Sequence, residues 1–181
     1  LEISSMTIGR QAFEGCTSLV SVLIPSRVTS VGQSAFYGCD GLTKVVFQEG
    51  EGSVEIQDRA FEGCLDIDTL VLSNRVTSIG DFAFQQCKIT SLVVPDSVTS
   101  IGAFAFAHCD QLSAIYLGDG LLEIGNFAFT SAPITNVVVP TGVTRIGIGA
   151  FGACDSLASI TLPYAWADND ENKSIQYIFH H

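Results

Sequence analysis

The chain has 181 residues, 47% of them hydrophobic and 15% charged, a composition typical of a folded domain with a sizeable core. Its net charge of −11 leaves only 8 Lys and Arg residues, which argues against nucleic acid as a partner and disfavours binding to anionic lipid. No apolar run approaches the ~18–20 residues of a membrane-spanning helix, so we expect no membrane insertion.

The dipeptide Ala-Phe recurs along the whole chain in steps of 22 to 25 residues. An aliphatic residue stands four positions before each Ala, and a Cys stands three positions after each Phe except the sixth, where Ala132 replaces it. Seven copies in register indicate an internal repeat. The repeated aromatic residues are Phe13, Phe36, Phe61, Phe84, Phe106, Phe129 and Phe151.

A short strand is predicted after each Cys position, and the first lies in LVSVLIP at residues 19–25. Its residues alternate with a period of two, which places Leu19, Val22 and Ile24 on the inner face. The next segment of a repeat, such as VTSIGDFAFQQC at residues 76–87, is expected to return along the opposite side. One unit cannot bury its apolar side alone, so the copies should stack into a solenoid. The large Phe side should be wider than the strand side, where neighbours lie ~4.8 Å apart, which predicts a concave strand face.

Three places depart from the regular spacing. The segment EGEGS at residues 49–53 adds two residues, whereas the turns at Lys88 and Pro133 lack one. An acidic region begins at the added segment, and we interpret it as a solvated flank, with a basic partner or a loosely held divalent ion as the alternative. Its acidic residues are Glu49, Glu51, Glu55, Asp58, Glu62, Asp66 and Asp68, with Arg59 as the one base.

The six Cys residues are predicted to be buried free thiols. Pairing between neighbouring repeats would leave at least two unpaired, and the Cα atoms of non-neighbours would lie ~10 Å or more apart. Ala132 shows that a small apolar side chain fills the same position, and free Cys packs as a small hydrophobe. His108 precedes Cys109, but adjacent side chains usually point apart, so we expect a surface histidine rather than a catalytic pair. No catalytic residue, metal site or cofactor is predicted.

The pattern L-x-x-[IV]-x-[IL]-P-x-x-V-T-x-[IV]-G-x-x-A-F-x-x-C, over residues 5–163, resembles the BspA-like, or Treponema pallidum-type, leucine-rich repeats. The resemblance implies a leucine-rich-repeat solenoid, specifically a right-handed β-α superhelix with short parallel concave strands and irregular or short helical convex segments. It also implies a cell-surface or secreted protein, often linked to adhesion to host matrix proteins. We expect about seven repeats of 22–25 residues in residues 1–163, and a C-terminal cap or the start of a truncated further segment in residues 164–181. Because Leu1 falls in mid-phrase, we expect a fragment or mature product of a longer chain.

Two surfaces are candidates for binding a partner. The outward column of the predicted strands is unexpectedly apolar, which either reflects the preference of β-branched residues for strands or marks a surface for protein binding or self-association. A second patch has a Phe directly before Ala-Phe in three successive repeats, and these rings either anchor a partner or pack on one another. The candidate residues are Val71, Val93, Tyr116 and Val138 in the column, and Phe82, Phe104 and Phe127 in the patch.

The sequence therefore predicts a non-enzymatic protein-binding module of a cell-surface or secreted adhesin-like protein. Its partner would be a protein, such as a host matrix or surface protein. The alternative is a structural spacer that positions other domains or self-associates through its ends and apolar face.

Overall fold

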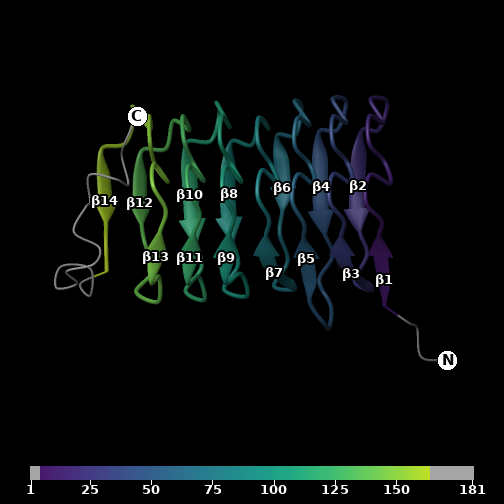
Figure 1. The fold of residues 1–181 in the computed structure, drawn as a ribbon, viewed down its shortest axis with the longest axis horizontal. Helices are drawn as coiled ribbons and strands as arrows, with labels where there is room; N and C mark the ends of the chain where they lie inside the picture. Colours follow the sequence, from purple (N-terminus) through teal and green to yellow (C-terminus); the bar gives the residue numbers. More distant parts are fainter. Residues whose placement is uncertain (1–4, 164–181) are drawn as a thin grey trace.

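The computed structural model describes residues 5–163, in which the repeats form the coils of a solenoid (Figure 1). A coil consists of an odd-numbered strand, a turn-rich segment that carries Ala-Phe, and an even-numbered strand. Successive coils lie side by side along the long axis of the molecule (Figure 1). This arrangement confirms the predicted leucine-rich-repeat solenoid with parallel strands. The cap or further segment predicted for residues 164–181 lies outside the described residues.

The even-numbered strands are the strand phrases that the sequence predicts. Their β-branched and apolar residues alternate between a buried and an outward position, as Val45 and Val46 do in β4. Neighbouring strands pair in parallel. The strands are β2 (Ser21–Ile24), β4 (Lys44–Phe47), β6 (Thr69–Val71), β8 (Ser91–Val94), β10 (Ala114–Leu117), β12 (Asn136–Val138) and β14 (Ser159–Thr161).

The odd-numbered strands form a second parallel sheet, of seven strands among the described residues, which the sequence analysis did not anticipate. They lie in the segment that reads Val-Thr-x-Ile or Val-Thr-x-Val in four of the seven coils, where the β-branched residues favour an extended chain. The strands are β1 (Met6–Ile8), β3 (Val28–Val31), β5 (Val54–Ile56), β7 (Val76–Ile79), β9 (Ser100–Ile101), β11 (Glu123–Ile124) and β13 (Arg145–Ile146).

The glycine that usually follows these strands allows adjacent coils to approach closely. A Cβ atom at Gly80 would lie 2.6 Å from the backbone nitrogen of Asp58, and one at Gly102 would lie 2.5 Å from that of Asp81. Such distances are too short for any side chain, so the repeated Ile-Gly reflects stacking rather than a ligand-binding loop.

No helix occurs in residues 5–163, so the predicted β-α superhelix with short helical segments is wrong in that detail. The Ala-Phe segments form turns instead, because each holds two residues in the left-handed region, such as Phe82 at φ 59° and Gln86 at φ 64°. Their N–H groups also bond between coils. For example, Phe84 donates to the carbonyl oxygen of Ala105 at 2.8 Å, which replaces the bond within a helix.

Two interruptions divide the ladder of even-numbered strands. Strands β2, β4 and β6 form one sheet, β8 and β10 a second, and β12 and β14 a third. The breaks lie before β8 and β12, the strands that follow the shortened turns at Lys88 and Pro133. A turn that lacks one residue shifts the strand that follows it relative to the strand of the preceding coil, and the two strands do not pair through a backbone hydrogen-bond ladder.

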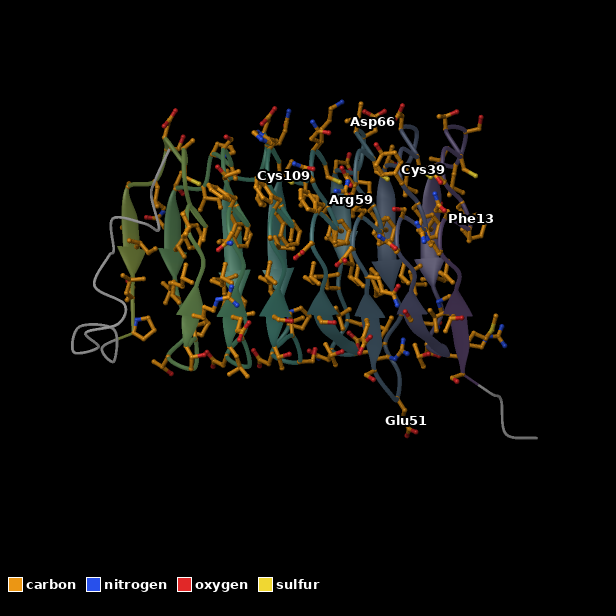
Figure 2. The ribbon with its side chains drawn as sticks, viewed as in Figure 1. Phe13, Cys39, Glu51, Arg59, Asp66 and Cys109 are labelled. Atoms are coloured by element: carbon orange, nitrogen blue, oxygen red, sulfur yellow. The ribbon has the colours of Figure 1, made fainter. Side chains whose placement is uncertain are left out.

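The core contains a ladder of stacked Phe rings, one from each coil (Figure 2). Their centroids lie 4.9 to 5.5 Å apart and the rings are parallel within 7°. From Phe36 to Phe151 these side chains are buried, whereas Phe13 on the first coil is 43% exposed. Burial of an aromatic column joins every coil to its neighbours and supplies much of the driving force for stacking.

Five cysteines form a second internal column, as predicted. All six cysteines are free, and the five buried thiols each donate a hydrogen bond of 2.9 to 3.5 Å to a Phe carbonyl oxygen in the preceding coil. Cys16 corrects the prediction for the sixth thiol because it is exposed. It lies on the first coil, beside which no preceding coil exists in the described part of the chain.

Candidate binding face

The even-numbered strands present a row of outward apolar side chains, as the sequence predicts. Neighbouring residues of a strand point to opposite faces, so each outward residue lies between two that face the core. The exposed fractions run from 46% for Val71 to 67% for Val138, and Val46 is half-buried. We call this row the apolar strip, which consists of Leu23, Val46, Val71, Val93, Tyr116 and Val138.

The strand register places most members of the apolar strip directly beside one another. Val46 pairs with Leu23 on one side and with Val71 on the other. Tyr116 pairs with Val93 in the next sheet. Residues in register on neighbouring parallel strands lie ~4.8 Å apart, so their side chains form a continuous surface within each sheet.

A hollow of about 450 Å³ lies on this face at the second interruption of the strand ladder. Tyr116 and Val138 line it from opposite sides, together with Asn136, Asp119 and Pro140. Two of the predicted binding residues, Tyr116 and Val138, therefore line the same hollow. The sequence signal for it was the missing residue at the Pro133 turn.

The second predicted patch consists of rings that pack on one another. Phe82, Phe104 and Phe127 are half-buried and stack with centroids 5.0 Å apart. The guanidinium of Arg59 covers the first ring at 4.5 Å from its centroid and also pairs with Glu62 at 2.9 Å. Ring faces in this patch are thus largely occupied from within the chain.

The pairing of Cys109 with His108 has no catalytic geometry. The Cys109 thiol is buried and donates to the carbonyl oxygen of Phe84 at 3.3 Å, while His108 is exposed. Burial raises the pKa of Cys109 from 9.0 to about 12, so the nucleophilic thiolate is not formed near neutral pH. Residues 5–163 contain no group of three or more His, Cys, Asp or Glu side chains placed to hold a metal ion.

Arg75, which the sequence analysis did not single out, anchors the added acidic segment. Its side chain is 2% exposed and donates to the carbonyl oxygens of Val28 at 2.8 Å and Glu51 at 3.0 Å. A longer contact of 3.5 Å reaches the carbonyl oxygen of Gln48. The signal was an Arg directly before the Val-Thr phrase in the coil that follows the insertion. The side chains of Glu49 and Glu51 in the segment are exposed.

The chain is similar to several solved leucine-rich-repeat proteins of bacteria. It is 34% identical to a leucine rich cell surface protein of Faecalibacterium prausnitzii, covering 85% of this chain and 42% of that one, with a TM-score of 0.72. It is 30% identical to a leucine-rich-repeat protein of T. pallidum, covering 84% and 71%, with a TM-score of 0.75. A Bacteroides ovatus leucine-rich-repeat protein is 27% identical, with coverage of 87% and 41% and a TM-score of 0.75. The chain thus spans less than half of two of these three proteins.

A comparison with curated protein sequences found no match. The described residues include no helix with the length and apolarity needed to cross a bilayer. The profile of the BspA type leucine rich repeat region matches in six copies, over residues 1–99 and 77–175. Repeat proteins of this type are generally surface-associated, and their fold generally serves as a non-enzymatic scaffold for protein interactions. Since the profile covers well over half of its residues, the chain belongs to the BspA-type leucine-rich-repeat family.

Proposed function

We propose that this chain is a non-enzymatic binding module of a cell-surface or secreted adhesin-like protein. It presents its even-numbered strands to a protein partner, such as a host matrix or surface protein. The observation that carries the proposal is the apolar strip, in which Val93 and Tyr116 are 63% and 58% exposed side by side. Water-facing positions of a sheet are usually polar, so a row of exposed apolar residues indicates a surface that another protein covers.

The stacked core makes this face a rigid platform. The Phe and thiol columns tie each coil to the next, so little conformational entropy is lost when a partner covers the strip. Tyr116 is the natural anchor because it lines the hollow and combines a large apolar ring with a hydroxyl group. The edges of Phe82, Phe104 and Phe127 offer a second, smaller contact surface.

A double substitution on the strip tests the proposal. Val93→Lys with Tyr116→Lys puts two charges where a partner would bury apolar surface, whereas Ser78→Lys with Ser100→Lys adds the same charge on the odd-numbered strands. Binding to a panel of immobilised matrix proteins should fall at least about tenfold in the first variant and stay within about twofold in the second. Equal binding by both variants would remove the strip as the site.

The alternative function is a structural spacer that self-associates through its ends or its apolar strip. The apolar strip favours it as well, because a second copy of this chain can cover the same exposed side chains. Sedimentation velocity over a range of protein concentrations separates the two functions. A spacer of this kind forms concentration-dependent oligomers, whereas a free binding face leaves the chain monomeric.

A further inference from the structure

Two rows of exposed carboxylates border the apolar strip, one at each end of the even-numbered strands. The entry rim lies in the turns before the strands and the exit rim in the turns after them. Figure 2 shows a member of each, Asp66 and Glu51, at opposite ends of the coils. The entry rim consists of Asp40, Asp66, Asp110 and Asp155. The exit rim consists of Glu49, Glu51, Asp96 and Asp119. The bases in or next to these turns are Arg27, Lys44, Arg75 and Lys88, and Arg75 donates to the backbone carbonyl oxygens of Gln48 and Glu51 beside the exit rim.

Most of the rim carboxylates lack a hydrogen-bond or ion-pair partner, whereas most of the other carboxylates have one. Elsewhere Glu62 pairs with Arg59 at 2.9 Å, and Glu123 pairs with Arg145 at 3.4 Å. On the rims, Asp66 pairs with Lys88 at 2.7 Å, and Asp96 accepts a backbone hydrogen bond at 2.9 Å. The other six rim side chains make no hydrogen bond or ion pair with the described residues, a state they share only with Glu55 in that part of the chain. Unneutralised charge is therefore concentrated around the strip.

The dimensions of the face match those of a helix. A strand of three or four residues is ~10–14 Å long, close to the ~10–12 Å diameter of an α-helix with its side chains, and the rim residues lie two to four positions beyond the strand ends. From Leu23 to Val138 the strip crosses six coils, or five steps of ~4.8 Å. That length of roughly 24 Å corresponds to about 16 helical residues at 1.5 Å each.

We infer that the apolar strip and its two rims bind a basic amphipathic helix of a protein partner. The apolar stripe of the helix lies on the strip, and the Lys or Arg side chains that border the stripe reach the carboxylates on both sides. This inference rests on the proposed function and specifies the partner. An extended strand fits less well, because its side chains point toward and away from the face rather than toward the rims.

The probe is a synthetic 18-residue peptide of Leu and Lys with Leu at helical spacing, together with a scrambled peptide of the same composition and a peptide with Glu in place of Lys. The entry rim is neutralised by Asp40→Asn, Asp110→Asn and Asp155→Asn. The matched control removes the same total charge elsewhere through Glu14→Gln, Glu55→Gln and Glu123→Gln. Isothermal titration in about 50 and 300 mM NaCl gives the affinity, and circular dichroism reports helix formation on binding.

The Leu/Lys peptide should bind one site per chain and become helical. Its affinity should fall on the order of tenfold in the rim variant, fall also at the higher salt concentration, and change little in the control. Equal binding of the scrambled peptide, equal loss in the control, or no binding would overturn the inference. If matrix-protein binding is lost in Val93→Lys with Tyr116→Lys yet is unchanged in the rim variant, the proposed function stands and the basic helix is refuted.

Discussion

Replacing Phe84 with Ala tests whether the Phe ladder holds neighbouring coils together. The ring is fully buried between Phe61 and Phe106, whose centroids lie 5.1 and 5.4 Å away. Truncating a buried Phe costs about 3–5 kcal/mol including the remaining cavity, and each lost ring contact adds roughly 0.5–1.5 kcal/mol. We therefore expect the free energy of unfolding to fall by about 5 kcal/mol, a large share of the total for a domain.

Phe13→Ala is the matched control because it removes the same side chain from the end of the ladder. Phe13 is 43% exposed and stacks on one ring only, Phe36, at 5.0 Å. Phe13→Ala removes about half as much buried surface and one ring contact instead of two, so we expect the free energy of unfolding to fall by about 2 kcal/mol. Phe84→Leu keeps most of the apolar volume without the stacked ring and should cost about 1–2 kcal/mol.

Urea unfolding followed by circular dichroism gives the free energy of unfolding for each variant. The slope of that energy against urea concentration reports whether the array still unfolds as one unit. Stability in a repeat array is a sum over coils and their neighbour contacts, so a weakened central contact can also separate the transition into two steps. Equal losses for Phe84→Ala and Phe13→Ala, or a loss below about 2 kcal/mol at Phe84, would refute the reasoning.

Three further predictions concern the buried thiols, the left-handed backbone and the acidic segment. Burial raises the pKa of Cys64 and Cys109 from 9.0 to about 12. The preference of the folded state for the neutral thiols contributes its full stability below pH 9, and this contribution is lost as the pH rises toward 12. The free energy of unfolding, measured with urea, should therefore be lower at about pH 10 than at about pH 8 by about 1 kcal/mol per thiol, and the difference should be smaller after Cys64→Ala. His108 at φ 57° occupies the same position of its repeat as Gly63 at φ 70°. Thermal melting should show that His108→Gly stabilises the fold by about 0.5–1 kcal/mol and that Gly63→Ala destabilises it by about 1 kcal/mol, because only Gly adopts this backbone conformation without strain. Shifts of the same sign for both variants would contradict this prediction. Arg75→Met should lower the free energy of unfolding by about 2 kcal/mol and speed hydrogen exchange in residues 49–53 first, because the Glu51 carbonyl there loses its donor. A uniform increase of exchange along the chain would contradict this prediction.

The candidate site was predictable in part. The outward position of Val93 and Tyr116 was predictable because side chains along a strand alternate between its two faces, so knowing which residues face the core also gives the ones that face outward. The patch at Phe82 left two interpretations open, since sequence spacing does not reveal whether a ring contacts solvent or the ring of the next coil. Arg75 was missed because its role depends on the carbonyl oxygen of Glu51 in the insertion and on that of Val28 in an earlier coil, 24 and 47 residues before it.

By itself, the sequence determined that the chain is a stack of equivalent coils with columns of Phe and Cys inside. A repeated pattern defines which positions are alike, and like positions in a solenoid occupy like surroundings. Only the tertiary structure decided how each coil closes. The left-handed residues and the hydrogen bonds between coils replaced the expected helices with turns, and the short turns at Lys88 and Pro133 divided the strand ladder. These features arise from contacts between neighbouring coils, which no single repeat contains.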